Sequence, residues 1–363
     1  MSFEINPKIE LAETLDSSFY TDSEHFTQCV ESVFVNSWQY VGDNTELLKQ
    51  PENIFPVTIL EKSMDEPVVL IKEGDAIRCT SNICTHRGFK IVHHPMKARK
   101  LTCGYHGRRF DLEGQFEFMP EFKEAEEFPR PCDHLNQLPI HRWKRFLFTG
   151  LSPKIDFARI SQKLDERLGF LNMDQWRFAP EYSKTYAIKA NWALYCDNYL
   201  EGFHIPFVHN DLGKIVDYGQ YITHVEDHMV LQIGYGNRGD IAFELPDNHP
   251  DSGRLVTAYY YWLFPNFMLN VYKWGVQINI VKPISVDFCK VEFLYYIADE
   301  ELWERQGKDD LAEKVEREDE FVVEAVQKGL KSRFYKNGRF SPKREKGVHY
   351  FHQLLSKYMR DFK

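Results

Sequence analysis

Cys84-Thr-His86-Arg-Gly88 and Cys103-Gly-Tyr-His106-Gly107 are the two stretches around which the sequence is organised. Each stretch brings one cysteine and one histidine on a short segment, and sixteen residues separate His86 from Cys103. Two thiolates and two imidazoles on two loops can surround one compact metal centre. The glycine that ends each stretch allows backbone amides to approach the sulfides of a cluster. The spacing therefore predicts an iron–sulfur cluster.

Three other interpretations compete for these four residues. A structural zinc site uses two cysteines and two histidines, although its first pair is usually two cysteines. Chance placement is disfavoured by the matching flanks, Arg87-Gly88 after the first pair and Gly107 after the second. A disulfide framework is disfavoured because an odd number of cysteines, seven, scattered through 363 residues fits a reducing cytoplasm. The remaining cysteines are then free core thiols: Cys29, Cys79, Cys132, Cys196 and Cys289.

Both stretches resemble the ligand loops of a Rieske 2Fe-2S domain. The resemblance implies that Cys84 and Cys103 hold one iron and that His86 and His106 hold the other. A cluster with two imidazole ligands has a raised reduction potential and passes single electrons. The chain departs from the usual family pattern at Gly104 and Arg108, where the family often has Pro and Trp. Neither position is a ligand, so the resemblance still holds.

Composition and charge narrow the class of protein. Hydrophobic residues make up 43% of the chain and aromatic residues 15%, which is ample for a buried core in one large or two modest domains. The net charge of −9 argues against nucleic acid or an anionic membrane as the main partner. The first residues have no basic and apolar leader pattern, and no later stretch approaches twenty apolar residues. We therefore expect a cytoplasmic protein with no membrane span.

The residue pattern along the chain predicts an α+β fold with three parts. Residues 1–40 have apolar residues at helical spacing and predict a helical arm on the catalytic domain. Residues 41–150 contain short β-like runs separated by turns, which predict a small antiparallel β domain that carries both ligand loops. Residues 151–363 predict a larger α+β domain built on an antiparallel sheet flanked by helices. Helices are expected at 191–204, at 301–334 and from residue 347 onward.

A second group of polar residues lies in the predicted helix of residues 191–204. Asp197, Glu201 and His204 are three or four residues apart, so a helix would present them on one face. His209 lies five residues beyond His204, and Pro206 interrupts the helix between them and can turn the chain back. Two ordinary histidines near a helix end are the competing interpretation. Because His204 and His209 lie downstream of a cluster motif, we interpret them as metal ligands.

Two imidazoles and one carboxylate form the facial triad that binds Fe(II). The candidate carboxylate is Asp319, which lies in an apolar stripe of the predicted helix, and its neighbour Glu318 is the alternative. The stripe consists of Asp319, Val322, Val323, Val326 and Leu330. A separate face, predicted to meet solvent, consists of Glu320, Glu324 and Gln327.

The order of these parts along the chain resembles the oxygenase α subunit of the Rieske non-heme iron oxygenases. Within that family, the segment of residues 264–270 and Pro283 resemble the branch that acts on choline, betaine and carnitine. The resemblance implies a homotrimer in which Glu201 bridges His204 to His106 of a neighbouring subunit. Glu201 and Asp197 are the candidate catalytic carboxylates.

The activity that this resemblance implies is hydroxylation with O2. An electron from the 2Fe-2S cluster would pass through Glu201 to a mononuclear Fe(II) held by His204, His209 and Asp319. We expect a separate NAD(P)H-dependent flavin or iron–sulfur reductase, because the chain lacks a Cys-x4-Cys-x2-Cys ferredoxin run and we expect no dinucleotide site.

The small-molecule substrate is the most open part of the prediction. An aromatic run, residues 259–262 with Phe264, Tyr272 and Trp274, suits a quaternary ammonium by cation–π attraction, a flat arene, or simply strand core. We favour monooxygenation of a choline-, betaine- or carnitine-like compound. The alternatives are an aromatic ring-hydroxylating dioxygenase and, outside this class, a Rieske electron carrier.

Overall fold

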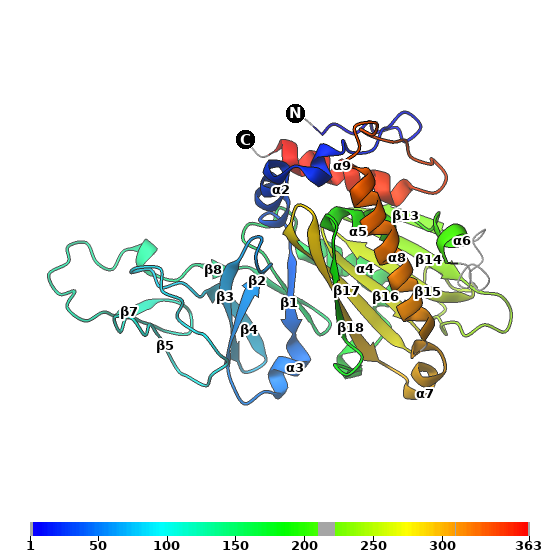
Figure 1. The fold of residues 1–363 in the computed structure, drawn as a ribbon. Coiled ribbons are helices and arrows are strands. Elements are labelled where there is room, and N and C mark those ends of the chain that lie inside the picture. Colours follow the sequence, from blue (N-terminus) through cyan, green and yellow to red (C-terminus); the bar gives the residue numbers. More distant parts are fainter. Residues whose placement is uncertain (1–2, 210–221, 309, 362–363) are drawn as a thin grey trace. The chain divides into compact units, whose positions relative to one another are not determined.

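The structure is a computed structural model that describes residues 3–209, 222–308 and 310–361. The chain divides into two compact units (Figure 1). The smaller unit is Trp38–Lys154, and the larger unit combines Met1–Ser37 with Ile155–Lys363. The smaller unit is therefore inserted in the sequence of the larger one. The predicted fold class, a small antiparallel β domain inserted in a larger α+β domain, is confirmed.

The smaller unit consists of short antiparallel strands in three sheets. The first sheet has the order β1 (Gln39–Asp43), β10 (Phe146–Thr149), β9 (Ile140–Trp143). The second has the order β2 (Ile54–Ile59), β3 (Glu66–Glu73), β4 (Ala76–Ser81), β8 (Gln137–Leu138). The third has the order β5 (Leu101–Thr102), β6 (Arg109–Phe110), β7 (Phe116–Phe118). A single α-helix, α3 (Asn44–Lys49), follows β1 in this unit, and Asp43 caps its N-terminus.

Both cysteine–histidine stretches are loops of this unit. The first stretch follows β4, and the second connects the hairpin strands β5 and β6. Cys84 and Cys103 belong to one apolar cluster with Ile54, Leu101 and Phe110. The loops are therefore anchored by core packing on one side, which leaves their other side free to hold a group.

The larger unit is built on an eight-stranded antiparallel sheet. Its order is β11 (Arg177–Phe178), β18 (Phe288–Ile297), β17 (Gly275–Ser285), β16 (Phe267–Tyr272), β15 (Val256–Leu263), β14 (Met229–Tyr235), β13 (Ile222–Glu226), and β12 (Lys184–Ile188) also pairs with β18. The central strands are rich in β-branched and aromatic residues and are buried along almost their whole length. Such strands belong to a sheet that is covered on both faces.

The helices of the larger unit place the second polar group. They are α1 (Ser18–Thr21), α2 (Ser23–Cys29), α4 (Phe157–Leu168), α5 (Trp192–Tyr199), α6 (Ile205–Val208), α7 (Glu300–Leu302), α8 (Asp310–Gly329) and α9 (Lys346–Arg360). Helix α5 packs against β17 and β18 of the sheet and against α8 and α9, which Figure 1 shows beside it. Within the described part of the chain, none of the helices has the length and apolar character that crossing a bilayer requires.

Two predicted helices are shorter than expected. The helix predicted for residues 191–204 ends at Tyr199, and the chain turns before α6 begins at Ile205. The helix predicted for residues 301–334 is replaced by α7, a π-helical turn (Trp303–Gly307) and α8, which ends at Gly329. In the second case Gly307 ends the π-helical turn and Gly329 ends α8, and glycine weakens a helix.

Candidate functional site

The two cysteine–histidine loops have the same backbone geometry. The Cys84 N–H donates to the Phe89 carbonyl at 2.9 Å, and the Gly88 N–H donates to the Cys84 carbonyl at 3.0 Å. The second loop repeats both bonds, from Cys103 to Arg108 and from Gly107 to Cys103, at 2.8 and 3.0 Å. Gly88 and Gly107 have φ values of 69° and 72°, in the left-handed region that favours glycine. Each glycine therefore closes its loop.

The four predicted cluster ligands form a cysteine pair and a histidine pair. Cys84 and Cys103 are buried, and the rings of His86 and His106 lie 4.8 Å apart. The Nδ1 atom of His86 is buried and has no hydrogen-bond partner among the described residues. A buried nitrogen without a partner is costly unless it binds something. These residues therefore fit an iron–sulfur cluster with two thiolate and two imidazole ligands.

A positive charge acts on both members of the first loop. Burial raises the pKa of the Cys84 thiol, and the charge of Arg108 opposes that rise. For the His86 imidazole, burial is again the largest influence and lowers the pKa, and the charges of Arg87 and Arg108 act in the same direction. Arg108 therefore lies within electrostatic reach of the cluster position.

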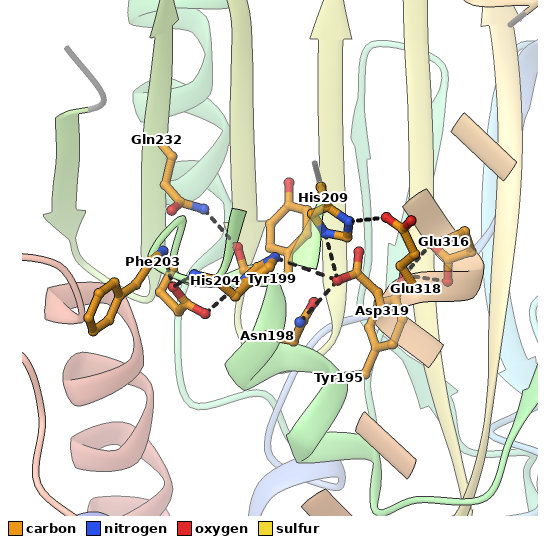
Figure 2. A network of polar contacts seen from close by, with 11 residues as sticks. Tyr195, Asn198, Tyr199, Phe203, His204, His209, Gln232, Glu316, Glu318 and Asp319 are labelled. Atoms are coloured by element: carbon orange, nitrogen blue, oxygen red, sulfur yellow. Dashed lines mark hydrogen bonds and ion pairs between the residues drawn. The ribbon is translucent and has the colours of Figure 1, made fainter. Parts of the chain in front are cut away.

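The second site brings His204, His209 and Asp319 together. Ligand atoms of these three side chains lie within 4.8 Å of one another. The Nε2 atom of His209 lies 3.1 Å from Oδ1 of Asp319, and the Nε2 atom of His204 lies 3.5 Å from the same oxygen. His204 and His209 flank helix α6, and Asp319 comes from α8. Figure 2 shows both imidazoles turned toward the Asp319 carboxylate.

The other nitrogen of each histidine is held by a glutamate. Nδ1 of His204 lies 2.6 Å from Glu201, and Nδ1 of His209 lies 2.7 Å from Glu318. In the tautomer that carries its proton on Nδ1, each ring donates a hydrogen bond to its glutamate. Each Nε2 lone pair is then available for a metal ion. Two imidazoles and a carboxylate with this orientation fit a divalent iron.

Electrostatics at this site favour a cation. Burial alone lowers the pKa of His209, but the contacts with Asp319 and Glu318 outweigh it and hold the pKa above its ordinary value. The site therefore stabilises positive charge, whether a proton or a metal ion carries it.

Asp197 is not part of this group, and the expectation that it shares a helical face with Glu201 and His204 is wrong. Helix α5 ends at Tyr199, so helical spacing does not extend from Asp197 to Glu201. Asp197 instead accepts hydrogen bonds from the Tyr20 hydroxyl at 2.8 Å and from Nε2 of His352 at 2.9 Å. It therefore ties α5 to α1 and α9.

Asn198, the neighbour of Asp197, contacts the site instead. Its Nδ2 donates to Oδ1 of Asp319 at 3.1 Å (Figure 2). Asn198 was not singled out from the sequence. The useful signal was its place in the same polar run as Asp197 and Glu201.

The buried face of α8 also differs from the predicted stripe. Val323 and Leu330 are buried as expected, but Val326 is exposed and Gln327 is buried. Gln327 accepts a hydrogen bond from the Asn191 N–H at 2.8 Å and donates one to the Tyr20 carbonyl at 3.1 Å. Polar side chains with such partners can lie in a core, which a count of apolar residues does not detect.

One further carboxyl group is buried on α8. Both carboxyl oxygens of Glu316 lie 3.0 Å from the Tyr195 hydroxyl, which donates to them. Burial raises the pKa of Glu316 to about 8, and the nearby charge of Asp319 adds to the rise. Sequence reasoning missed this residue.

The predicted aromatic run is divided between the two faces of the sheet. Gln232, Tyr260, Asn270, Gln277 and Tyr295 are directly opposite one another on successive strands, so they form one row on one face. The row faces α5, because the Tyr199 hydroxyl donates to Asn270 at 2.7 Å.

Neighbours of this row are aromatic. Tyr272 lies 5.9 Å from Tyr260 and stacks on Trp274 at 5.0 Å between ring centroids. Tyr259 faces the other side of the sheet, where its hydroxyl donates to Asp251.

One glycine pattern needs a structural test. Gly234-Tyr-Gly236-Asn-Arg-Gly239 has the glycine spacing of a dinucleotide-binding loop, which the sequence was not expected to contain. That loop requires a parallel strand followed by a helix. Here it begins inside β14, whose neighbours are antiparallel, and residues 236–246 contain no helix. The glycines therefore do not form a nucleotide site.

Comparison with known proteins gives two family matches. The Rieske [2Fe-2S] domain model matches residues 37–129, and the model of the ring hydroxylating alpha subunit (catalytic domain) matches residues 173–361. Chloroplastic choline monooxygenase of Arabidopsis thaliana is 28% identical over 97% of this chain and 85% of its own length. The carnitine monooxygenase oxygenase subunit of Acinetobacter baumannii is 27% identical over 96% of this chain and 95% of its own.

Two solved structures have a similar fold. The quaternary ammonium Rieske monooxygenase CntA superposes with a TM-score of 0.76 at 24% identity, over 99% of this chain and 100% of that one. Naphthalene 1,2-dioxygenase from Rhodococcus sp. superposes with a TM-score of 0.70 at 15% identity, over 96% of this chain and 94% of that one.

Proposed function

Because the chain belongs to the ring hydroxylating alpha subunit family, with a Rieske [2Fe-2S] domain followed by a catalytic domain, we propose that it is the terminal oxygenase of a system that hydroxylates a small quaternary ammonium compound. The class of enzyme is a Rieske non-heme iron oxygenase, similar to choline and carnitine monooxygenases. The choice of substrate within this class is our proposal.

The observation that carries the proposal is the orientation of the two histidines. Both Nε2 atoms converge on Oδ1 of Asp319, while both Nδ1 atoms are held by glutamates. A pure electron carrier has no use for such a site. We therefore propose His204, His209 and Asp319 as ligands of the mononuclear iron.

For the cluster, we propose Cys84 and Cys103 on one iron and His86 and His106 on the other. The matched loops and the unpartnered Nδ1 of His86 support this set. When bound, the cluster supplies single electrons and the mononuclear iron supplies the O2 chemistry. The chain contributes the binding and orientation of these groups and of the substrate.

Three residues around the mononuclear site have roles that follow from their contacts. Glu201 and Glu318 keep the proton of each histidine on Nδ1, so that Nε2 faces the ion. Asn198 orients the Asp319 carboxylate through its hydrogen bond to Oδ1. In the homotrimer that we propose, Glu201 also hydrogen-bonds His106 of the partner subunit and forms the route for the electron.

The substrate proposal is supported by the relatives and by the row on the sheet. The similar curated proteins are named for choline and carnitine. The row that faces α5 consists of neutral amides and tyrosines, with Tyr272 beside it. Aromatic faces attract a quaternary ammonium without requiring an ion pair. We further propose a separate NAD(P)H-dependent reductase and a cytoplasmic location.

The test is oxygen uptake with product identification. Purified protein with a generic flavin and iron–sulfur reductase is supplied with choline, betaines, carnitine and simple aromatics. We expect uptake that depends on a quaternary ammonium compound and yields an aldehyde or formaldehyde, and we expect none with His204→Ala. A cis-diol from an aromatic would contradict the substrate proposal, and no substrate-dependent uptake with any compound would contradict the oxygenase proposal.

A further inference from the structure

Arg108 is a buried cation in the smaller unit. Only 1% of its surface is exposed, and its guanidinium lies 5.0 to 5.6 Å from the ring centroids of Phe110, Phe116 and Phe128. Its Nη2 donates to Asp133, to the side-chain oxygen at 2.8 Å and to the carbonyl at 3.1 Å. Its Nε is buried and has no hydrogen-bond partner among the described residues. Burying such a group is costly, so its retention calls for a reason.

The pair of Arg108 and Asp133 connects both cluster loops. The carbonyl of Arg108 accepts the hydrogen bond from the Cys103 N–H that closes the second loop. The hydroxyl of Thr85, between Cys84 and His86, donates to the Asp133 carbonyl at 2.8 Å. The guanidinium is thereby held beside both loops in one orientation.

The negative charge of Asp133 is shared with a second partner. Burial raises the pKa of Asp133, but Arg108 and the Arg130 N–H outweigh that effect and hold its pKa below the ordinary value. The Arg130 N–H donates to its other oxygen at 2.8 Å. Asp133 is therefore an ionised group that accepts hydrogen bonds from both Arg108 and the Arg130 backbone.

We propose that Arg108 raises the reduction potential of the Rieske cluster and that Asp133 opposes it, so that this ion pair sets the potential of the electron donor. Reduction adds one electron, and therefore one negative charge, to the cluster. A fixed buried cation stabilises that charge because little water screens it. This inference rests on the cluster ligands proposed above.

The test measures the midpoint potential of the cluster in the full-length protein by dithionite titration with mediators. We expect Arg108→Gln to lower the one-electron reduction constant roughly tenfold, which is about 59 mV. Asp133→Asn removes the opposing charge and is expected to shift the potential upward, whereas Arg108→Lys keeps the charge and is expected to stay near the wild-type value. Arg109→Gln, at the next residue, is the matched control and is expected to change little.

Potential shifts of opposite sign in Arg108→Gln and Asp133→Asn distinguish an effect of charge from structural damage. General loosening of the loops would shift the potential of both variants in the same direction. Iron and sulfide content and the electron-spin signal of the reduced cluster show that each variant holds an intact centre. Shifts of equal sign, or no shift in either variant, would overturn the inference. If Arg108→Gln loses the cluster, Asp133→Asn still decides, since an unchanged or lowered potential overturns it. A wild-type protein without the rhombic Rieske signal would instead contradict the proposed ligands.

Discussion

Asp319 and Glu318 are adjacent carboxylates that contact the same histidine through different nitrogens. Asp319 faces Nε2 of His209, and Glu318 faces Nδ1. Only Asp319 also lies near Nε2 of His204. Position on the helix therefore separates two chemically similar side chains into a proposed ligand and a residue that orients a ligand. Spacing alone left this choice open, because adjacent residues of a helix are both able to reach a neighbouring segment.

The two carboxylates are expected to respond differently to substitution. Asp319→Ala removes a ligand, so we expect no mononuclear iron while the cluster spectrum is retained. Glu318→Gln weakens only the support of His209, so we expect iron affinity to fall about 10- to 100-fold and occupancy to recover with excess iron. The measurement is iron content and affinity, with the cluster absorbance as internal reference.

Glu320→Gln is the matched control, because Glu320 pairs with Arg317 at 2.9 Å and does not contact either histidine in the described structure. We expect wild-type iron binding from this variant. Loss of iron in Glu318→Gln with retention in Asp319→Ala would reverse the assignment.

At the scale of elements, helix α5 explains which site residues were predictable. Asn191 caps its N-terminus, and two residues of the polar run that follows, Asn198 and Glu201, contact Asp319 and His204. The end of the helix at Tyr199 was not predictable from spacing, since no proline or glycine lies before Gly202. The break moves Glu201 and His204 into a turn, and it exchanges Asp197 for Asn198 at the site. The residue types of the site were therefore predictable from the sequence, whereas the directions of their side chains depended on tertiary packing.

Helix α8 carries a prediction about pH. The pKa of Glu316 is raised from 4.5 in an ordinary environment to about 8 in the folded protein, chiefly by burial. Between these two pH values the folded chain holds a proton that the unfolded chain has lost. Folding stability is therefore expected to fall as the pH rises from about 4.5 to about 8, by at most about 1.4 kcal/mol per pH unit from this group.

This effect is measured as the urea midpoint of the protein after a chelator has removed the mononuclear iron. The wild type and Glu316→Gln are compared across the same pH range. The variant keeps a polar partner for Tyr195 but has no proton to lose, so we expect its midpoint to depend less on pH. Identical pH dependence in the two proteins would show that Glu316 ionises normally when folded.

At the scale of the whole molecule, the order of the motifs predicted the fold better than any single motif did. Alternating short β runs around the cysteine–histidine pairs, followed by longer apolar strands, indicated a small β domain within a larger α+β domain. The buried polar connections, such as the Gln327 amide and the Arg108–Asp133 pair, could not be predicted. Their partners are far away in the sequence, and a polar or charged residue is by its type expected at the surface.

The central claim is that this chain holds two separate iron centres, and metal analysis of anaerobically purified protein tests it most directly. We expect about three iron atoms and about two acid-labile sulfides per chain, and His204→Ala is expected to lose about one iron while keeping the sulfide. Zinc at either centre, or a wild-type iron content that the cluster alone accounts for, would contradict the account.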